Sequence, residues 1–238
     1  MTRKHRLTRT ALALATAVAA SPALADTVTT SGWYFGGGKS VNTKTTATVI
    51  YGGSSHSPID KAVSAGAFRA TWNGRTFETY CTDIFQTIGL TATYSGFSLH
   101  DGDAWFSPAK ARDLGRLWTV AHDGAGSDAV DAKSSAAFQI AAWEILYESS
   151  GSYNLASGVF QASGGSAATG SPSALQLAGT WLGSLPSTSL YSVDVLVSAT
   201  RQDLLVATPV PEPESYAMFI AGLGLMAVVA RRRSMSLA

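Results

Sequence analysis

Cysteine is almost missing from this chain, whose 238 residues include one, Cys81. A single cysteine excludes an internal disulfide, and an odd cysteine in an exported chain indicates an intermolecular bridge or a reactive thiol. The histidines between residues 26 and 208 stand singly, without the spacing of metal ligands. The sequence therefore predicts no disulfide framework, no metal site and no cofactor.

Positive charge is also scarce in the body of the chain. Residues 26–208 contain ten Lys and Arg against 14 Asp and Glu, a balance near −4, with no basic run. Binding to nucleic acid requires clustered cations that neutralise phosphates. We therefore expect no nucleic-acid partner.

The first 25 residues have the three parts of a secretory signal peptide. Four basic residues lie within the first nine, an apolar run covers Ala11 to Ala20, and Ala23-Leu24-Ala25 has the small-x-small pattern of a cleavage site. We expect a signal peptidase to cut between Ala25 and Asp26. The domain that remains, residues 26–208, is long enough to form one core.

The last thirty residues contain three elements in a fixed order. Pro211-Glu212-Pro213 is followed by an uncharged apolar run at residues 216–230 and then by Arg231-Arg232-Arg233. Arginine clusters stay on the cytoplasmic side of a membrane and stop transfer. The apolar run is shorter than the roughly 20 residues that usually span a bilayer, but tilting or snorkelling flanks can compensate. The pattern predicts one C-terminal transmembrane helix with the domain outside the cytoplasm.

This order of elements resembles the PEP-CTERM sorting tail of Gram-negative surface proteins, over residues 209–233 of the 209–238 tail. The resemblance implies handling by an exosortase, a membrane protease-transpeptidase that acts near Pro211-Glu212-Pro213. The protein would be held in the inner membrane before processing and then reach the cell surface or the exopolysaccharide matrix. An ordinary anchor helix or a buried core helix remains the alternative.

The pattern of residues 26–208 predicts an α+β domain, a β-rich barrel or sandwich with two inserted helices. Asn73-Gly74 between two alternating runs predicts a tight hairpin, with Cys81 at the inward end of its second strand. Residues 151–172 are rich in Gly, Ser and Ala and predict a long loop. The expected strands are 45–51, 67–72, 75–82, 191–198 and 203–207, and the expected helices are 108–122, 129–147 and 174–182.

The second of these helices contains an unusual polar residue. Between Ala136 and Tyr147 only Gln139 and Glu144 are polar, so the helix should be buried almost all round. A buried carboxamide without partners costs about 1–3 kcal/mol, so Gln139 needs hydrogen bonds or a different covalent state. One such state is an internal thioester, in which the sulfur of Cys81 replaces the ammonia of the Gln139 side chain.

Two short motifs are similar to those of bacterial thioester domains, the adhesin modules that form a Cys–Gln bond. They are Tyr80-Cys81-Thr82-Asp83 and the stretch from Phe138 to Glu144, which has an apolar-Gln-apolar-x-apolar-Trp frame. The resemblance implies that Cys81 supplies the sulfur and Gln139 the acyl carbon, with Trp143 packed behind. Asp83 and Glu144 are the possible polar neighbours. It further implies one-time covalent capture of an amine-bearing target, which is adhesion and not enzymatic turnover.

Two other functions remain open from the sequence. The domain could be a non-covalent matrix or biofilm protein that binds exopolysaccharide, with a structural Cys81 and Gln139. A cysteine hydrolase would need a histidine, His100 or His122, to activate Cys81, and a nearby aspartate to orient it.

Overall fold

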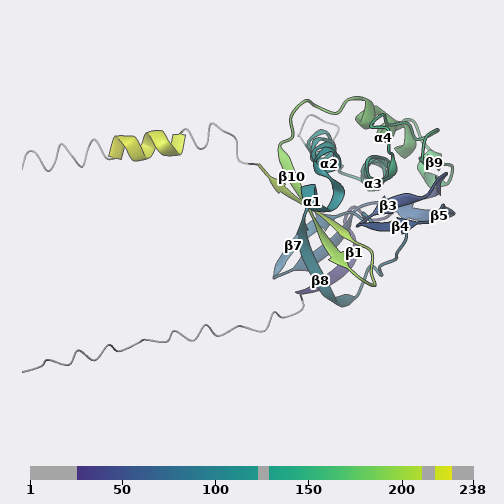
Figure 1. Ribbon diagram of the computed structural model, residues 1–238, viewed down its shortest axis with the longest axis horizontal. Coiled ribbons are helices and arrows are strands. Elements are labelled where there is room, and N and C mark those ends of the chain that lie inside the picture. The colour runs from purple at the N-terminus through teal and green to yellow at the C-terminus, as the bar shows by residue number, and fades with distance from the viewer. Residues whose placement is uncertain (1–25, 123–128, 211–217, 227–238) are drawn as a thin grey trace, which may run out of the picture.

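The computed structural model describes residues 26–122, 129–210 and 218–226 (Figure 1). Its largest sheet has six antiparallel strands in the order β11-β10-β8-β1-β6-β7, and contacts between β7 and β11 nearly close it into a barrel. The strands of this sheet are β1 (Asp26–Trp33), β6 (Phe68–Trp72), β7 (Arg75–Thr79), β8 (Thr93–Asp101), β10 (Tyr191–Ser198) and β11 (Leu204–Pro209).

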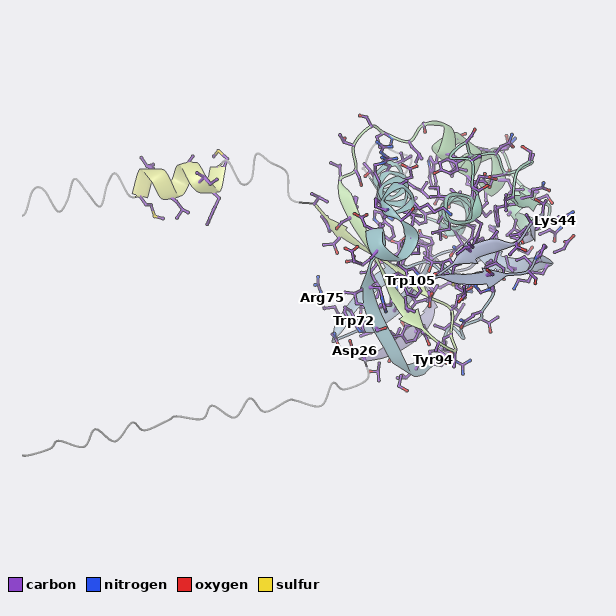
Figure 2. All side chains as sticks on the ribbon, viewed as in Figure 1. Asp26, Lys44, Trp72, Arg75, Tyr94 and Trp105 are labelled. Carbon is purple, nitrogen blue, oxygen red and sulfur yellow. The ribbon has the colours of Figure 1, made fainter. Side chains whose placement is uncertain are left out.

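Helices α2, α3 and α4 gather on one side of the barrel, with two small sheets beside them (Figure 1). One small sheet has the order β5-β2-β9 and the other pairs β3 with β4. The helices are α1 (Gly102–Phe106), α2 (Pro108–Ala121), α3 (Ala132–Tyr147), α4 (Ala174–Gly183) and the 3-10 turn η1 (Ser166–Ala168). The remaining strands are β2 (Lys39–Thr45), β3 (Val49–Tyr51), β4 (Ser54–His56), β5 (Asp60–Ala65) and β9 (Phe160–Ser163). Figure 2 shows Lys44, in β2, far from Trp72 and Arg75 on the barrel.

The mixed α/β character and the barrel-like sheet agree with the sequence, but the expected number of inserted helices was too small. Three helices, α1, α2 and α3, follow β8 in series. The additional helix α1 begins because the Asp101 side chain accepts a hydrogen bond from the backbone N–H of Ala104, at 2.9 Å. Helix α1 has only five residues and no apolar repeat, so its sequence showed no helical periodicity.

The Asn73-Gly74 hairpin is confirmed. β6 and β7 pair from Phe68 opposite Thr79 to Trp72 opposite Arg75. Asn73 and Gly74 have φ values of 49° and 75°, the left-handed conformation that a type I′ turn requires.

Two expected strand boundaries were wrong. The strand expected at 45–51 is divided into β2 and β3, because Thr46 leaves β2 and donates its N–H to the carbonyl of Val159, at 2.8 Å. β7 ends at Thr79, and Cys81 contributes only one antiparallel bridge, with Leu204.

The expected loop at 151–172 was wrong in part, because it contains β9 and η1. β9 pairs with β2 and buries Phe160 completely, so tertiary pairing overrides a composition typical of loops. Strand β8 was not expected at all, since its sequence is mostly polar and it buries only Phe97.

The helix boundaries are close to those expected. α3 begins at Ala132 and not at 129, because the Asp131 side chain caps it and forms a capping box with Ser134. Ser107 precedes Pro108 at the start of α2, and its side chain makes no capping bond.

The ends of the chain are described only in part. Residues 218–226 are helical, while residues 1–25, Pro211-Glu212-Pro213 and Arg231-Arg232-Arg233 lie outside the described residues. Within the described ranges, no helix combines the length and hydropathy needed to cross a membrane. The transmembrane helix and the signal cleavage therefore stay predictions.

Candidate functional site

The fold brings Cys81 and Gln139, 58 positions apart in sequence, into direct contact. The backbone N–H of Cys81 donates to Oε1 of Gln139 at 2.9 Å, and Nε2 of Gln139 donates to the backbone carbonyl of Cys81 at 2.7 Å. The reverse orientation of the carboxamide would place donor against donor and acceptor against acceptor. The two bonds therefore fix the orientation of the carboxamide, with Oε1 toward the N–H of Cys81 and Nε2 toward its carbonyl.

Strand β11 holds the segment that contains Cys81. The N–H of Leu205 donates to the carbonyl of Tyr80, and the N–H of Thr82 donates to the carbonyl of Asp203, both at 2.9 Å. Cys81 itself lies between the two hydrophobic clusters of the domain, one inside the barrel and one beneath the helices. Its position is thus set by backbone pairing on one side and by the Gln139 amide on the other.

Helix α3 carries Gln139, the other member of the pair. The helix is buried along nearly its whole length, as its sequence predicted, and Gln139 is 1 % exposed. The capping box at Asp131 fixes the start of the helix, and so the register in which Gln139 meets Cys81.

The thiol of Cys81 is a weak acid here. Burial raises its pKa well above the ordinary value, and the charge of Asp83 raises it further. Asp83 is itself buried, which raises its own pKa, and its Oδ1 accepts the N–H of Phe85 at 2.7 Å. The chain thus keeps a neutral thiol beside a carboxyl group that acts on it through space.

A buried polar network adjoins Cys81 and was not anticipated from the sequence. The hydroxyl of Tyr51 donates to Oδ2 of Asp203 at 2.9 Å and lies 2.7 Å from Oγ1 of Thr82. The hydroxyl of Tyr147 donates to the carbonyl of Thr82 and accepts the N–H of Ile84. Tyr147 lies two helical turns after Gln139, and this spacing was the only available signal.

Trp143 and Glu144 lie on different sides of α3. Trp143 is 1 % exposed, one turn after Gln139, and lines a cavity of about 350 Å³ with Ile84 and Gln86. Glu144 instead accepts the N–H of Asn154 at 2.6 Å, and burial raises its pKa to about 7. The structure therefore connects Glu144 to the segment after α3 and not to Cys81.

The histidines within the described residues have partners of their own. His100 bonds to Ser98, and His122 bonds to Glu78 and stacks on Trp118. His56 stacks on Phe85, with ring centroids 4.0 Å apart. Neither His100 nor His122, the candidates for a hydrolase, has a contact with Cys81 among these interactions.

Metal ligands do not converge in the part of the chain that the structure describes. It contains no group of three or more His, Cys, Asp or Glu side chains that could hold an ion.

Comparison with known families identifies one segment of this chain, its tail. Residues 209–233 match the PEP-CTERM protein-sorting motif. The motif implies an exported surface protein that an exosortase processes at the membrane. No curated protein and no solved structure matches the chain.

Proposed function

We propose that this exported, exosortase-sorted protein carries an internal thioester between Cys81 and Gln139 and uses it once, to attach covalently to an amine-bearing target. The observation that carries the proposal is the hydrogen bond from the N–H of Cys81 to Oε1 of Gln139, at 2.9 Å. It places the glutamine carbonyl beside the only cysteine of the chain.

Bond formation is balanced without a co-reactant. The sulfur of Cys81 attacks Cδ of Gln139, the thiol proton passes to the departing nitrogen, and ammonia leaves. An incoming primary amine then attacks the same carbon, forms an amide with the Gln139 side chain and returns Cys81 to a free thiol. Asp83 has an electrostatic role before attack, because its charge raises the pKa of the Cys81 thiol and so favours the protonated form.

The two hydrogen bonds support this step in different ways. The N–H of Cys81 donates to the oxygen on which negative charge develops during attack, as an oxyanion-hole donor does. The carbonyl of Cys81 holds the nitrogen that must leave. Apolar clusters on both sides of Cys81 limit the access of water, which favours survival of the thioester over hydrolysis.

Reaction with methylamine tests the proposal. The purified domain should incorporate one methylamine, and peptide mass spectrometry should locate it on Gln139. The Cys81→Ala variant, which lacks the sulfur, should incorporate none. Incorporation that is absent in both proteins, or equal in both, would overturn the proposal.

A second candidate is a non-covalent matrix protein, and one observation favours it. A cavity of about 290 Å³ is lined by Trp72, Arg75, Leu99 and Asp194 from strands of the barrel, a mixture of aromatic, aliphatic and charged groups suited to a small polar ligand. In this case the hydrogen bonds of Gln139 are purely structural. Saturable binding of exopolysaccharide fragments that is lost in Trp72→Ala, without methylamine incorporation, would favour this candidate.

A further inference from the structure

The sorting motif begins inside the folded domain. Strand β11 pairs with β10 up to Pro209, opposite Tyr191, and the motif match also starts at residue 209. The next residue is still bound, because the N–H of Val210 donates to the carbonyl of Leu190 at 2.8 Å. Pro211 follows immediately, so no spacer separates the sheet from the Pro-Glu-Pro signal.

The exit point of the chain is held firmly by helix α2. The N–H of Leu190 donates to Oγ1 of Thr119 at 2.9 Å. The helix passes so close that a Cβ at Gly115 would lie 2.4 Å from the carbonyl oxygen of Tyr191. Val210 is therefore bonded to a segment that is itself fixed to the helical layer.

Chain length then limits where an enzyme can act. Pro213 is three residues beyond Val210, a reach of at most about 10 Å in a fully extended chain. An enzyme that reads an extended peptide uses pockets for several successive side chains. An enzyme that binds Pro211-Glu212-Pro213 must therefore also contact the edge of the domain beside Val210 and Leu190.

That edge is apolar. Leu190 is 45 % exposed and Val210 is 46 % exposed, and their backbones are hydrogen-bonded to each other. We propose that the exosortase docks on this rim, which we define as Leu190, Tyr191, Pro209 and Val210, and that it recognises the folded domain together with the sorting motif. The inference rests on the sorting motif and is independent of the thioester.

Substitution of the rim tests the docking directly. In cells that contain an exosortase, the full chain with Leu190→Ser, which lies outside the matched motif, should be processed about fivefold more slowly, as expected when a central apolar contact of an interface is lost. The Ile50→Ser variant is the matched control, because Ile50 is 71 % exposed on β3 and is not part of the rim. It should be processed at the wild-type rate. Unchanged thermal unfolding of the purified domains excludes misfolding as the cause.

A spacer distinguishes docking from simple obstruction. A flexible Gly/Ser insert of about ten residues between Thr208 and Pro209 separates Leu190 and Tyr191 from the sorting motif and leaves the matched residues 209–233 undivided. Docking predicts that this insert slows processing, since the two contacts can no longer be made together in the native geometry. Faster or unchanged processing of the chain with the insert, or wild-type processing of the Leu190→Ser variant, would overturn the proposal.

Discussion

The backbone N–H and carbonyl of Cys81 are both hydrogen-bonded, and burial raises the pKa of its thiol. Gln139 satisfies both the backbone N–H and the backbone carbonyl of Cys81. This arrangement serves two purposes in the proposed chemistry, because it orients the acyl carbon and polarises its oxygen.

Replacing Gln139 by leucine should destabilise the domain by about 1–3 kcal/mol, because the N–H and carbonyl of Cys81 would lose their side-chain partners. Urea unfolding of the mature domain measures this difference. The Gln161→Leu variant is a suitable control, since its only side-chain hydrogen bond is exposed and long, at 3.4 Å. We expect it to change the free energy of unfolding by about 0.5 kcal/mol at most. Equal losses in the free energy of unfolding of the two variants would contradict a stabilising role for the Gln139 hydrogen bonds.

The thiol of Cys81 should react slowly with iodoacetamide near neutral pH. Burial and Asp83 raise its pKa, so the reactive thiolate is rare at that pH. The Gln139→Ala variant keeps the thiol free of any thioester and is the appropriate sample. Its alkylation rate should continue to rise beyond pH 9, while a plateau below pH 8 would contradict the raised pKa.

Helix α3 is the element on which the site depends, because it carries Gln139 and Trp143 and begins at a defined cap. The sequence predicted this helix and its burial from its apolar composition, and the hairpin from Asn73-Gly74. It could not locate the true start, because Asp131 was one of several polar residues in a Gly/Ser/Asp stretch. Only the hydrogen bonds to the first turn identify it as the cap.

Loss of that cap should weaken the whole domain. We expect Asp131→Ala to lower the free energy of unfolding by about 1 kcal/mol, because two N–H groups of the first turn lose their acceptor. Asp131→Asn retains a capping oxygen and should preserve most of the stability. Chemical denaturation of the two variants makes the comparison, and indistinguishable midpoints would argue against the cap.

Glu144, on a different side of α3 from Gln139, should make stability depend on pH. The pKa of Glu144 is about 7 in the folded domain, against 4.5 for the free side chain, because burial disfavours its charge. The folded state then binds a proton that the unfolded state releases between these values. Stability from this group is therefore complete below about pH 4.5 and is lost as the pH rises through 7, by on the order of 2 kcal/mol.

Urea unfolding between pH 4.5 and 8 checks this slope. The Glu144→Gln variant should lose most of the decrease between pH 6 and 8. The part that remains at lower pH belongs to the other carboxyl groups whose pKa burial raises, which are Asp203, at about 6, Asp83 and Asp194. A wild-type stability that rises with pH over this range would contradict the prediction.

At the scale of the whole molecule, the sequence predicted the barrel-like character of the domain but not the pairing that completes it. The six-stranded order places β8 and β1 at the centre, and β8 is mostly polar. β8 forms a strand because it pairs with β1 on one side and with β10 on the other, and both of these strands are distant in sequence. The same long-range pairing brings Leu204 and Asp203 beside Cys81, so the polar network around the site could not be read from local patterns.

One strand of the molecule contacts both the Cys81 segment and the sorting motif. β11 supports the Cys81 segment at its beginning and presents the sorting motif at its end. Sorting to the outside of the cell suits an acyl donor, because external amines are accessible only there.

Intact mass spectrometry of the untreated mature domain is the most direct test of the Cys81–Gln139 bond. The proposal predicts a wild-type mass lower by one ammonia than that calculated from the sequence, and full calculated masses for the Cys81→Ala and Gln139→Ala variants. A wild-type domain at its full calculated mass, with a thiol that can be alkylated and no glutamate formed at position 139, would contradict the thioester.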